Sequence, residues 1–262
     1  MAMNQNGSPV RRLQQPRYGI DAPAFLAGLG VAGVACCLAA VRGRRGRIAT
    51  ATAGTVLLAH AGFFLHTTLR GKLRSWERVL DRAGLAGNER LLDLGCGRGA
   101  VLIAAARRLP AGCAVGADLW SGKDQSGNSP GATLANAAAA GVAGRVEVHT
   151  ADMTALPFED SSFDVVTSAM AIHNIGPAEG RSRAVDEAMR VLRPGGQLLV
   201  ADPRPMARKY AAHLGQGTLR DLGPGYWYGG PWLGVTLLHV VKADRPGHPG
   251  ANSGQVRTRG ES

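Results

Sequence analysis

The chain has 262 residues, of which 45% are hydrophobic, and a formal net charge of +11. This length suits one or two domains, and the apolar content is too high for a disordered protein. The cysteines have neither the spacing of a zinc site nor that of a disulfide framework, so we expect no metal site and a reducing compartment. Residues 1–74 hold ten Lys or Arg against one acid, whereas residues 75–243 are nearly neutral. A nucleic-acid-binding protein would carry its basic patch on the main domain, which here is the nearly neutral stretch 75–243. We therefore expect no nucleic-acid partner.

After a basic segment (1–21), the arm contains two uncharged runs, residues 22–41 and 48–69. At 1.5 Å per residue, a helix over either run is long enough to cross a hydrocarbon core of about 30 Å. We therefore expect residues 22–70 to form a hydrophobic hairpin that spans a membrane. One span with an interfacial helix, or no span, remains open. A cleaved signal peptide does not fit the first run, because arginines follow it instead of a cleavage site.

The run from 91 to 99, LLDLGCGRG, is typical of a buried strand that ends in a tight turn, and residues 100–109 continue as a helix. Glycines at such a turn allow positive φ angles and a close approach of a ligand to the backbone. The pattern Gly95-x-Gly97-x-x-Ala100 also fits a dinucleotide fingerprint. Asp93 favours another ligand, because a carboxylate repels a pyrophosphate but stabilises the amine and sulfonium cations of S-adenosylmethionine.

Further strands follow at the intervals that a doubly wound sheet needs. Residues 113–118 form a second expected strand, which ends in an acid that is placed to accept hydrogen bonds from ribose hydroxyls. A third strand over 145–150 leads into Asp152 and Met153, which are suited to an adenine amino group and ring face. We expect a fourth strand over 163–168. A helix over 179–192 should stop at Arg193-Pro194-Gly195-Gly196, before a fifth strand over 197–201.

Together, LLDLGCGRG, GADLW, TADMTALPFEDSSFDVV and RVLRPGGQLLVAD resemble the class I S-adenosylmethionine-dependent methyltransferases, most of all those of quinone biosynthesis and other small molecules. The resemblance covers about residues 72–243. It implies an α/β fold with a Rossmann-like, doubly wound, seven-stranded sheet that is mostly parallel and has an antiparallel last strand. Residues 218–222 and 233–241 would supply the final pair. The expected methyltransferase domain is 71–243, and we expect the tail, 244–262, to be disordered.

The resemblance also implies which residues bind the donor, S-adenosylmethionine. The glycine loop and Asp93 would hold the methionine part of the donor, and Asp118, at the end of the second strand, would hold the ribose. Later residues would contact the adenine and the methyl group. Cys96 is a small residue within that loop. The expected donor-binding residues are Asp93, Gly95, Cys96, Gly97, Gly99, Asp118, Leu119, Asp152, Met153 and Ala169.

Candidate acceptor residues follow the fourth strand and the last hairpin. His173 and Asn174 should lie near the transferred methyl group, where a histidine is suited to remove a proton. The alternative is a histidine that bonds to neighbouring backbone. The polar loop 120–130 is either part of the donor pocket, a lid or a surface loop. The aromatic turn 226–232 is either a plug on the sheet edge, a wall of an apolar pocket or a membrane-interface surface.

These observations predict a membrane-anchored methyltransferase whose catalytic domain faces the cytoplasm, where the donor is. Its acceptor is expected to be a small, apolar, lipid- or quinone-like molecule. We further expect Trp76 to face the membrane surface. A chain that starts near Lys72, and so lacks the hairpin, should still bind the donor. The alternatives are a nicotinamide-dependent oxidoreductase and a membrane-tethered donor-binding module without transfer activity.

Overall fold

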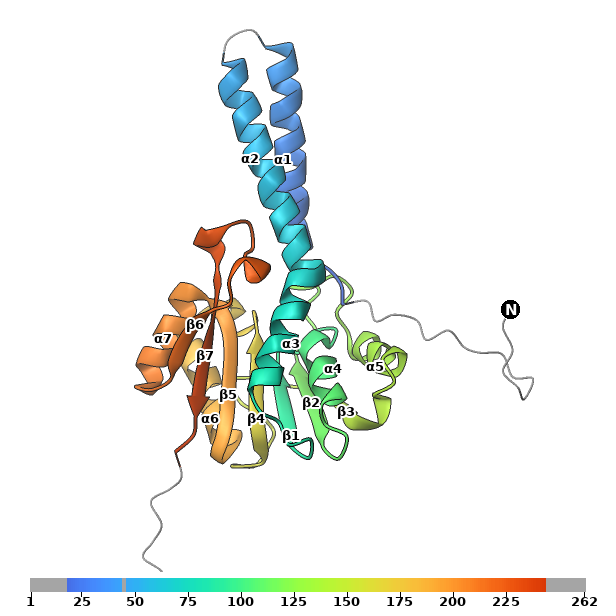
Figure 1. The fold of residues 1–262 in the computed structure, drawn as a ribbon, viewed down its shortest axis with the longest axis vertical. Coiled ribbons are helices and arrows are strands. Elements are labelled where there is room, and N and C mark those ends of the chain that lie inside the picture. The colour runs from blue at the N-terminus through green and yellow to red at the C-terminus, as the bar shows by residue number, and fades with distance from the viewer. Residues whose placement is uncertain (1–17, 44–45, 244–262) are drawn as a thin grey trace, which may run out of the picture.

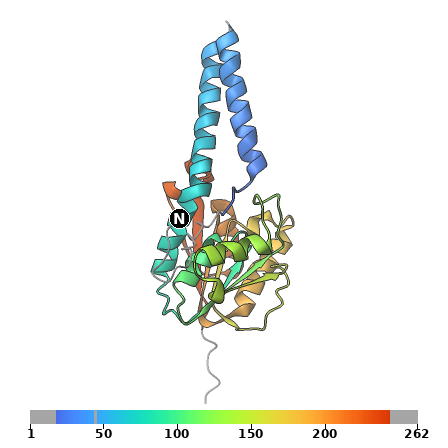
Figure 2. The same ribbon diagram turned by 90° about the vertical axis from the view of Figure 1, so that its right-hand side faces the viewer.

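A computed structural model describes residues 18–43 and 46–243. The expected disordered tail (244–262) and most of the basic N-terminal segment lie outside the described residues. Within them, a long helical hairpin rises from an α/β domain (Figures 1 and 2). Its helices are α1 (Pro23–Arg42) and α2 (Arg47–His66).

The hairpin is held together by close packing of small residues. Gly33 of α1 and Gly54 of α2 are its buried glycines. A Cβ atom added to Gly33 would lie 2.8 Å from Leu58 Cγ, and one added to Gly54 would lie 2.6 Å from Cys37 Sγ. Small residues that let two helix backbones approach closely are typical of helix pairs in membranes, where the hydrophobic effect does not drive association. Most other residues of the two helices are exposed or partly exposed.

The second hairpin helix does not end at the domain surface. It continues through a π-helical turn, η1 (Thr67–Gly71), into α3 (Lys72–Arg82), so that one helical rod runs from the hairpin to the sheet (Figure 1). Trp76 of α3 is only 2% exposed and belongs to the core. The expectation that Trp76 faces the membrane is therefore wrong, because the apolar side of this helix packs on the domain.

The domain is built on a seven-stranded sheet with the order β3-β2-β1-β4-β5-β7-β6. All neighbouring pairs are parallel except those of β7, which is antiparallel to both β5 and β6. This is the fold that the sequence predicts. The strands are β1 (Arg90–Leu94), β2 (Cys113–Asp118), β3 (Val146–Thr150), β4 (Phe163–Ala169), β5 (Leu192–Pro203), β6 (Thr218–Asp221) and β7 (Val235–Val241).

Helices cover both faces of this sheet, which explains the nearly continuous apolar runs of its central strands. One core joins α3 and the helices α4 (Ala100–Arg107) and α5 (Pro130–Ala139) to one face. A second core joins α6 (Ala178–Val191) and α7 (Arg204–Leu214) to the other. Neighbouring side chains alternate between them, since Leu91 and Val165 belong to the first core and Leu92 and Val166 to the second.

Two of the differences from the expected boundaries have a clear physical reason. The stretch 193–196 was expected to separate a helix from a strand, but it already belongs to β5, which begins at Leu192. Gly195 and Gly196 exchange backbone hydrogen bonds with Lys242, and this pairing extends the strand. At the other end, β7 begins at Val235 instead of residue 233, because Pro231–Leu233 form a 3-10 turn (η5).

Candidate functional site

A cavity of about 750 Å³ lies at the carboxyl ends of the parallel strands, where open α/β sheets bind ligands. Nine of the ten predicted donor-binding residues line it, and so do His173 and Asn174. The exception is Gly99, which begins α4 with a φ of +84°. A Cβ atom there would lie 3.1 Å from Ile103 and from Thr133, so Gly99 allows the helix to pack and does not face the cavity.

The loop between β1 and α4 forms the floor of the donor side. Gly95 and Gly97 both have positive φ angles, and a Cβ atom on either would collide with Ala171 or Gln125 at 2.3–2.4 Å. The Gly97 amide donates a 2.8 Å hydrogen bond to Asp118 Oδ2. Glycine is therefore required at both positions by conformation and by space, as expected for a loop that a ligand approaches closely. Cys96 between them is buried, and its sulfur fills the space above the glycine at position 116.

Asp93 is the acid at the bottom of the cavity. Its side chain is almost fully buried, and its Oδ1 accepts a 2.8 Å hydrogen bond from the Thr167 hydroxyl. Burial raises the pKa of Asp93 to about 7, because the charged form loses its hydration. A cationic ligand group at this position would favour the ionised form. The site thus fits the amine and sulfonium of S-adenosylmethionine better than it fits a pyrophosphate.

Asp118 ends β2 on the opposite side of the glycine loop. Besides the bond from Gly97, its Oδ1 accepts hydrogen bonds from the Trp120 amide at 2.5 Å and from Asn128 Nδ2 at 3.2 Å. Each carboxylate oxygen has two lone pairs, so three of the four are used and Oδ2 can still accept one hydrogen bond from a ligand in the cavity. The role of Asp118 toward a ribose stays a prediction.

The remaining predicted donor residues surround the space beyond Asp118. Leu119 and Ala169 line it from the ends of β2 and β4. Met153 packs toward Gly95, since a Cβ atom on that glycine would lie 3.4 Å from the Met153 methyl carbon. Asp152 is exposed, and its Oδ1 accepts two 2.8 Å hydrogen bonds from Thr154. These bonds close a turn at Asp152, and its bond to adenine stays a prediction.

His173 is paired with a buried carboxylate, a contact that the sequence does not indicate. Its Nδ1 lies 2.7 Å from Oδ1 of Asp202, a fully buried residue of β5. Because an ionised carboxylate only accepts hydrogen bonds, Nδ1 carries the hydrogen, which leaves Nε2 as an acceptor. The His173 amide and the Tyr210 hydroxyl also donate to Asp202 Oδ2, at 3.1 and 2.9 Å. Asp202 and Tyr210 were not predicted, since nothing in their local sequence pairs them with His173.

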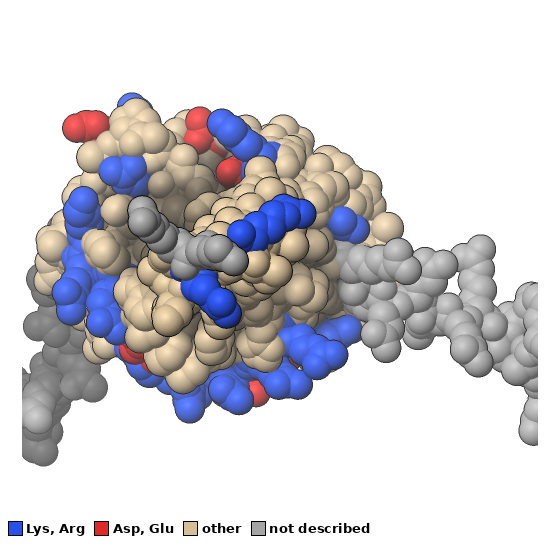
Figure 3. Space-filling view, turned by 90° about the horizontal axis from the view of Figure 1, so that it is seen from above, with Lys and Arg blue, Asp and Glu red and all other residues tan. Residues whose placement is uncertain are grey.

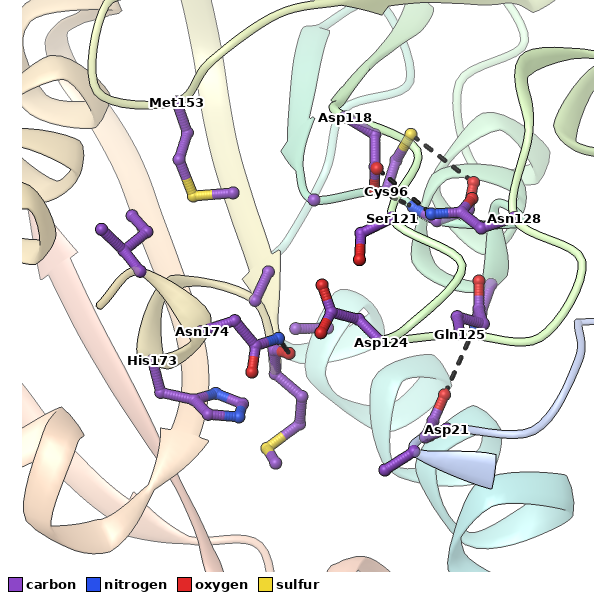
Figure 4. A pocket seen from close by; sticks show the side chains of 18 of the residues that line it. Asp21, Cys96, Asp118, Ser121, Asp124, Gln125, Asn128, Met153, His173 and Asn174 are labelled. Carbon is purple, nitrogen blue, oxygen red and sulfur yellow. Dashed lines mark hydrogen bonds between the residues drawn. The ribbon is translucent and has the colours of Figure 1, made fainter. Parts of the chain in front are cut away.

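The cavity-facing side of this arrangement is visible in Figure 4. The His173 ring and the Asn174 amide both point toward the middle of the cavity, opposite Asp124 of the polar loop. Asn174 Nδ2 makes a 3.4 Å contact with the Met170 carbonyl oxygen. Of the alternatives for the polar loop, the surface loop is excluded, because five of its residues line the cavity: Ser121, Lys123, Asp124, Gln125 and Asn128.

An apolar wall closes the other end of the cavity. Phe64 of α2 packs against Tyr228 with ring centroids 4.9 Å apart, and Tyr228 packs against Tyr226 at 5.9 Å. Phe25 at the start of α1 joins Phe64 at 5.6 Å and is 50% exposed. All four rings line the cavity. The aromatic turn is thus a pocket wall, and it is completed by residues from the base of the hairpin.

Comparison with known proteins finds methyltransferases that are similar to part of this chain. Residues 92–200 match the family model of a methyltransferase domain. A ubiquinone/menaquinone biosynthesis C-methyltransferase of Geotalea daltonii is 33% identical over 145 residues, which are 54% of this chain and 58% of that protein. The chain spans about half the length of the curated relatives it matches.

Solved structures agree at the level of the fold. Geranyl diphosphate C-methyltransferase from Streptomyces coelicolor has a TM-score of 0.52 at 17% identity, over 65% of this chain and 80% of that one. The [4+2]-cyclase SpnF has the same TM-score at 20% identity, over 64% and 80%. The family match over residues 92–200, the sheet order and the glycine loop together support a class I S-adenosylmethionine-dependent methyltransferase domain with S-adenosylmethionine as its methyl donor.

Proposed function

We propose that this protein transfers a methyl group from S-adenosylmethionine to a small apolar acceptor with a quinol-like or phenolic ring. The observation that carries the proposal is the continuity of the cavity. The same cavity is lined by the predicted donor-binding acids and glycines, by His173 and by the aromatic wall. An apolar ring fits against Tyr226, Tyr228 and Phe64, whereas a charged acceptor would lose its hydration there.

S-Adenosylmethionine, when bound, supplies a methyl group that its sulfonium already activates. The protein's contribution is then to hold both molecules in line, which gains up to about 7–11 kcal/mol in well-oriented reactions. His173 removes the proton that the acceptor must lose, through the Nε2 atom that the bond to Asp202 leaves unprotonated. Asp202 also stabilises the imidazolium that forms. The names of the curated relatives, which are quinone-biosynthesis enzymes, support this acceptor class.

We also propose that the hairpin spans a membrane and that the domain faces the cytoplasm. Both helices are long and apolar enough to span, and only 11% of each apolar window is buried, unlike the core helix of a soluble domain. The donor is a cytosolic metabolite, which favours this orientation.

The position of the cavity links the two proposals. Viewed along the hairpin, the surface beside it is hollowed (Figure 3), and the cavity-lining residues Phe25 and Leu233 are exposed near the hairpin base. Trp232 is 71% exposed and lies beside His60 of α2, with ring centroids 6.3 Å apart. Tryptophan favours the membrane–water interface. An acceptor that is dissolved in the bilayer would then reach His173 without crossing water.

The test is methyl transfer by the full-length protein in lipid vesicles, with S-adenosylmethionine labelled in the methyl group. We expect label in a reduced quinone with an isoprenoid tail, and much less in a water-soluble phenol at the same bulk concentration. Equal labelling of both would refute access through the bilayer. Donor binding without label in any quinol or phenol would refute the proposed acceptor class and favour a donor-binding module.

A further inference from the structure

Asp21 lies just before the first hairpin helix, yet its carboxylate joins three distant elements beside the cavity. Lys72 of α3 donates to both of its oxygens, at 2.6 and 2.7 Å. Tyr228 of the aromatic turn donates to Oδ2 at 2.8 Å, and Gln125 of the polar loop donates to Oδ1 at 3.3 Å. Asp21 and Lys72 are both largely shielded from water. A buried charge with this many donors is costly to replace, because each partner would be left without its bond.

The backbone around Asp21 is attached to the same polar loop. The Ala22 amide donates to the Asp124 carbonyl at 3.0 Å, and the Ser126 amide donates to the Ile20 carbonyl at 3.1 Å. Asp21 and Gln125 form an antiparallel bridge between these two bonds. The segment before the hairpin therefore holds the polar loop as an added strand would.

Gln125 carries this contact onward to the donor loop. While its Nε2 donates to Asp21, its Oε1 accepts a 2.7 Å hydrogen bond from the Arg98 amide. The same Oε1 would lie 2.4 Å from a Cβ atom on Gly97, so the side chain rests directly on the glycine loop. The negative charge of Asp21 dictates which end of the Gln125 amide faces Arg98, since only the NH₂ end donates. Figure 4 shows Asp21 and Gln125 in contact at the edge of the cavity.

We propose that Asp21 is a positioning residue for donor binding, which acts through Gln125 on the loop at Gly97 and Arg98. It fixes the polar loop over the donor side of the cavity and links that loop to the base of the hairpin through Lys72. Residues before the first membrane helix are then part of the donor site. This reverses the expectation that a chain starting near Lys72 still binds the donor, because such a chain lacks Asp21.

The experiment measures binding of S-adenosylhomocysteine to the full-length protein in detergent by calorimetry. It needs no acceptor, so its failure is distinct from failure of the proposed acceptor class. Asp21→Asn keeps the size and shape of the side chain but removes its charge, which weakens the hydrogen bond from the Gln125 amide. We expect the Kd to rise about fivefold. Gln125→Ala should raise it by a similar factor. The matched control is Asp186→Asn, an exposed acid of α6 that pairs with His213, and its Kd should not change.

The double variant distinguishes positioning from general loosening. If Asp21 acts through Gln125, the Kd of Asp21→Asn/Gln125→Ala will be no higher than that of the weaker-binding single variant. If the Kd of the double variant rises by the product of the increases in the two single variants, Asp21 acts by another route and the proposal is overturned. An unchanged Kd for Asp21→Asn overturns it as well. Should Asp21→Asn not fold, Tyr228→Phe removes only one donor to Asp21, and an unchanged Kd in that variant counts equally against the proposal.

Discussion

The donor half and the acceptor half of the cavity are built in different ways. Most of the predicted donor half comes from residues 93–153, where each predicted residue lies in a strand or in the loop that follows it. The acceptor half combines Phe25, Phe64, His173 and Tyr228, which the chain brings together from more than 200 residues apart. In the proposed function, the donor would be bound mostly by a local sequence pattern, whereas the acceptor would be bound by residues that only the tertiary structure brings together. Mutations in the acceptor half should therefore change the rate and leave donor affinity unchanged. Mutations in the donor half should change donor affinity and leave the rate at saturating donor nearly unchanged.

The largest effect is expected at His173. Replacement by alanine removes the base and should lower kcat by 10²–10⁴-fold, the usual contribution of proton transfer by a side chain, without changing the Kd of S-adenosylhomocysteine. Steady-state rates in vesicles and calorimetry measure the two quantities. His213→Ala is a matched control, because it breaks a His–Asp pair of similar length, 2.8 Å, on the domain surface. A large change in donor affinity at His173 would show that the two halves are not separate.

Asp118 should show the reverse pattern. Asp118→Ala removes the carboxylate that is expected to accept from a ribose hydroxyl, and a hydrogen bond to a charged group contributes about 1.5–3 kcal/mol, so donor affinity should fall about tenfold or more. At saturating donor, kcat should stay within a factor of two or three. Asp81→Ala, which removes a surface ion pair with Arg108, serves as the control. Unchanged binding of S-adenosylhomocysteine to Asp118→Ala would place the ribose elsewhere.

The pKa of Asp93 predicts a pH dependence confined to the donor half. In the free protein this pKa is about 7, and a bound cation lowers it because it stabilises the carboxylate. Binding therefore releases a proton below pH 7, and the Kd should rise up to tenfold per unit as the pH falls. Above about pH 8 the Kd should be constant.

Thr167 offers a way to sharpen the same measurement. Its hydroxyl lowers the pKa of Asp93, so Thr167→Val should raise that pKa and move the break in the titration to higher pH. Calorimetry in two buffers of different ionisation enthalpy counts the released proton. A donor affinity that is constant between pH 6 and 8 would contradict the assignment of Asp93 to the cationic part of the donor.

The smallest effect is expected at Trp232. Loss of one aromatic contact with the membrane interface should raise the KM for a bilayer-dissolved acceptor by roughly two- to fivefold in Trp232→Ala. Donor affinity and the rate with a water-soluble phenol should not change. Leu134→Ala removes a partly exposed apolar side chain from α5, far from the hairpin base, and provides the comparison. Equal effects of both variants would indicate a nonspecific loss of stability.

The donor half could be predicted because its signals are local. The second strand has the expected bounds, Cys113–Asp118, and the acid that ends it lines the cavity, since a strand and its C-terminal residue are adjacent in the chain. Gly99 shows the limit of this reasoning. A glycine pattern does not tell whether a missing side chain makes room for a ligand or for a neighbouring helix, and here it makes room for the helix.

The acceptor half and the link to the hairpin could not be predicted in this way. Asp202 was identified only as the end of a strand, and its bond to His173 depends on how β5 lies beside β4. Asp21 was the single acid of a basic arm, and Lys72 one of the cations that flank the hairpin. Their pairing crosses the domain boundary expected at residue 70, and no short-range pattern reports a contact between residues 51 apart.

The uninterrupted helix from Arg47 to Arg82 has a mechanical consequence. Its 36 residues span about 54 Å, and its lower turns are embedded in the domain core. A flexible linker would let the domain tumble and sample acceptors at any depth of the bilayer. If the hairpin spans a membrane as proposed, this continuous helix would instead set the height and tilt of the domain above the lipid. The rate of methylation would then depend on how far the ring of an acceptor emerges from the hydrocarbon. Two acceptors with the same ring but different depths in the bilayer would be methylated at different rates.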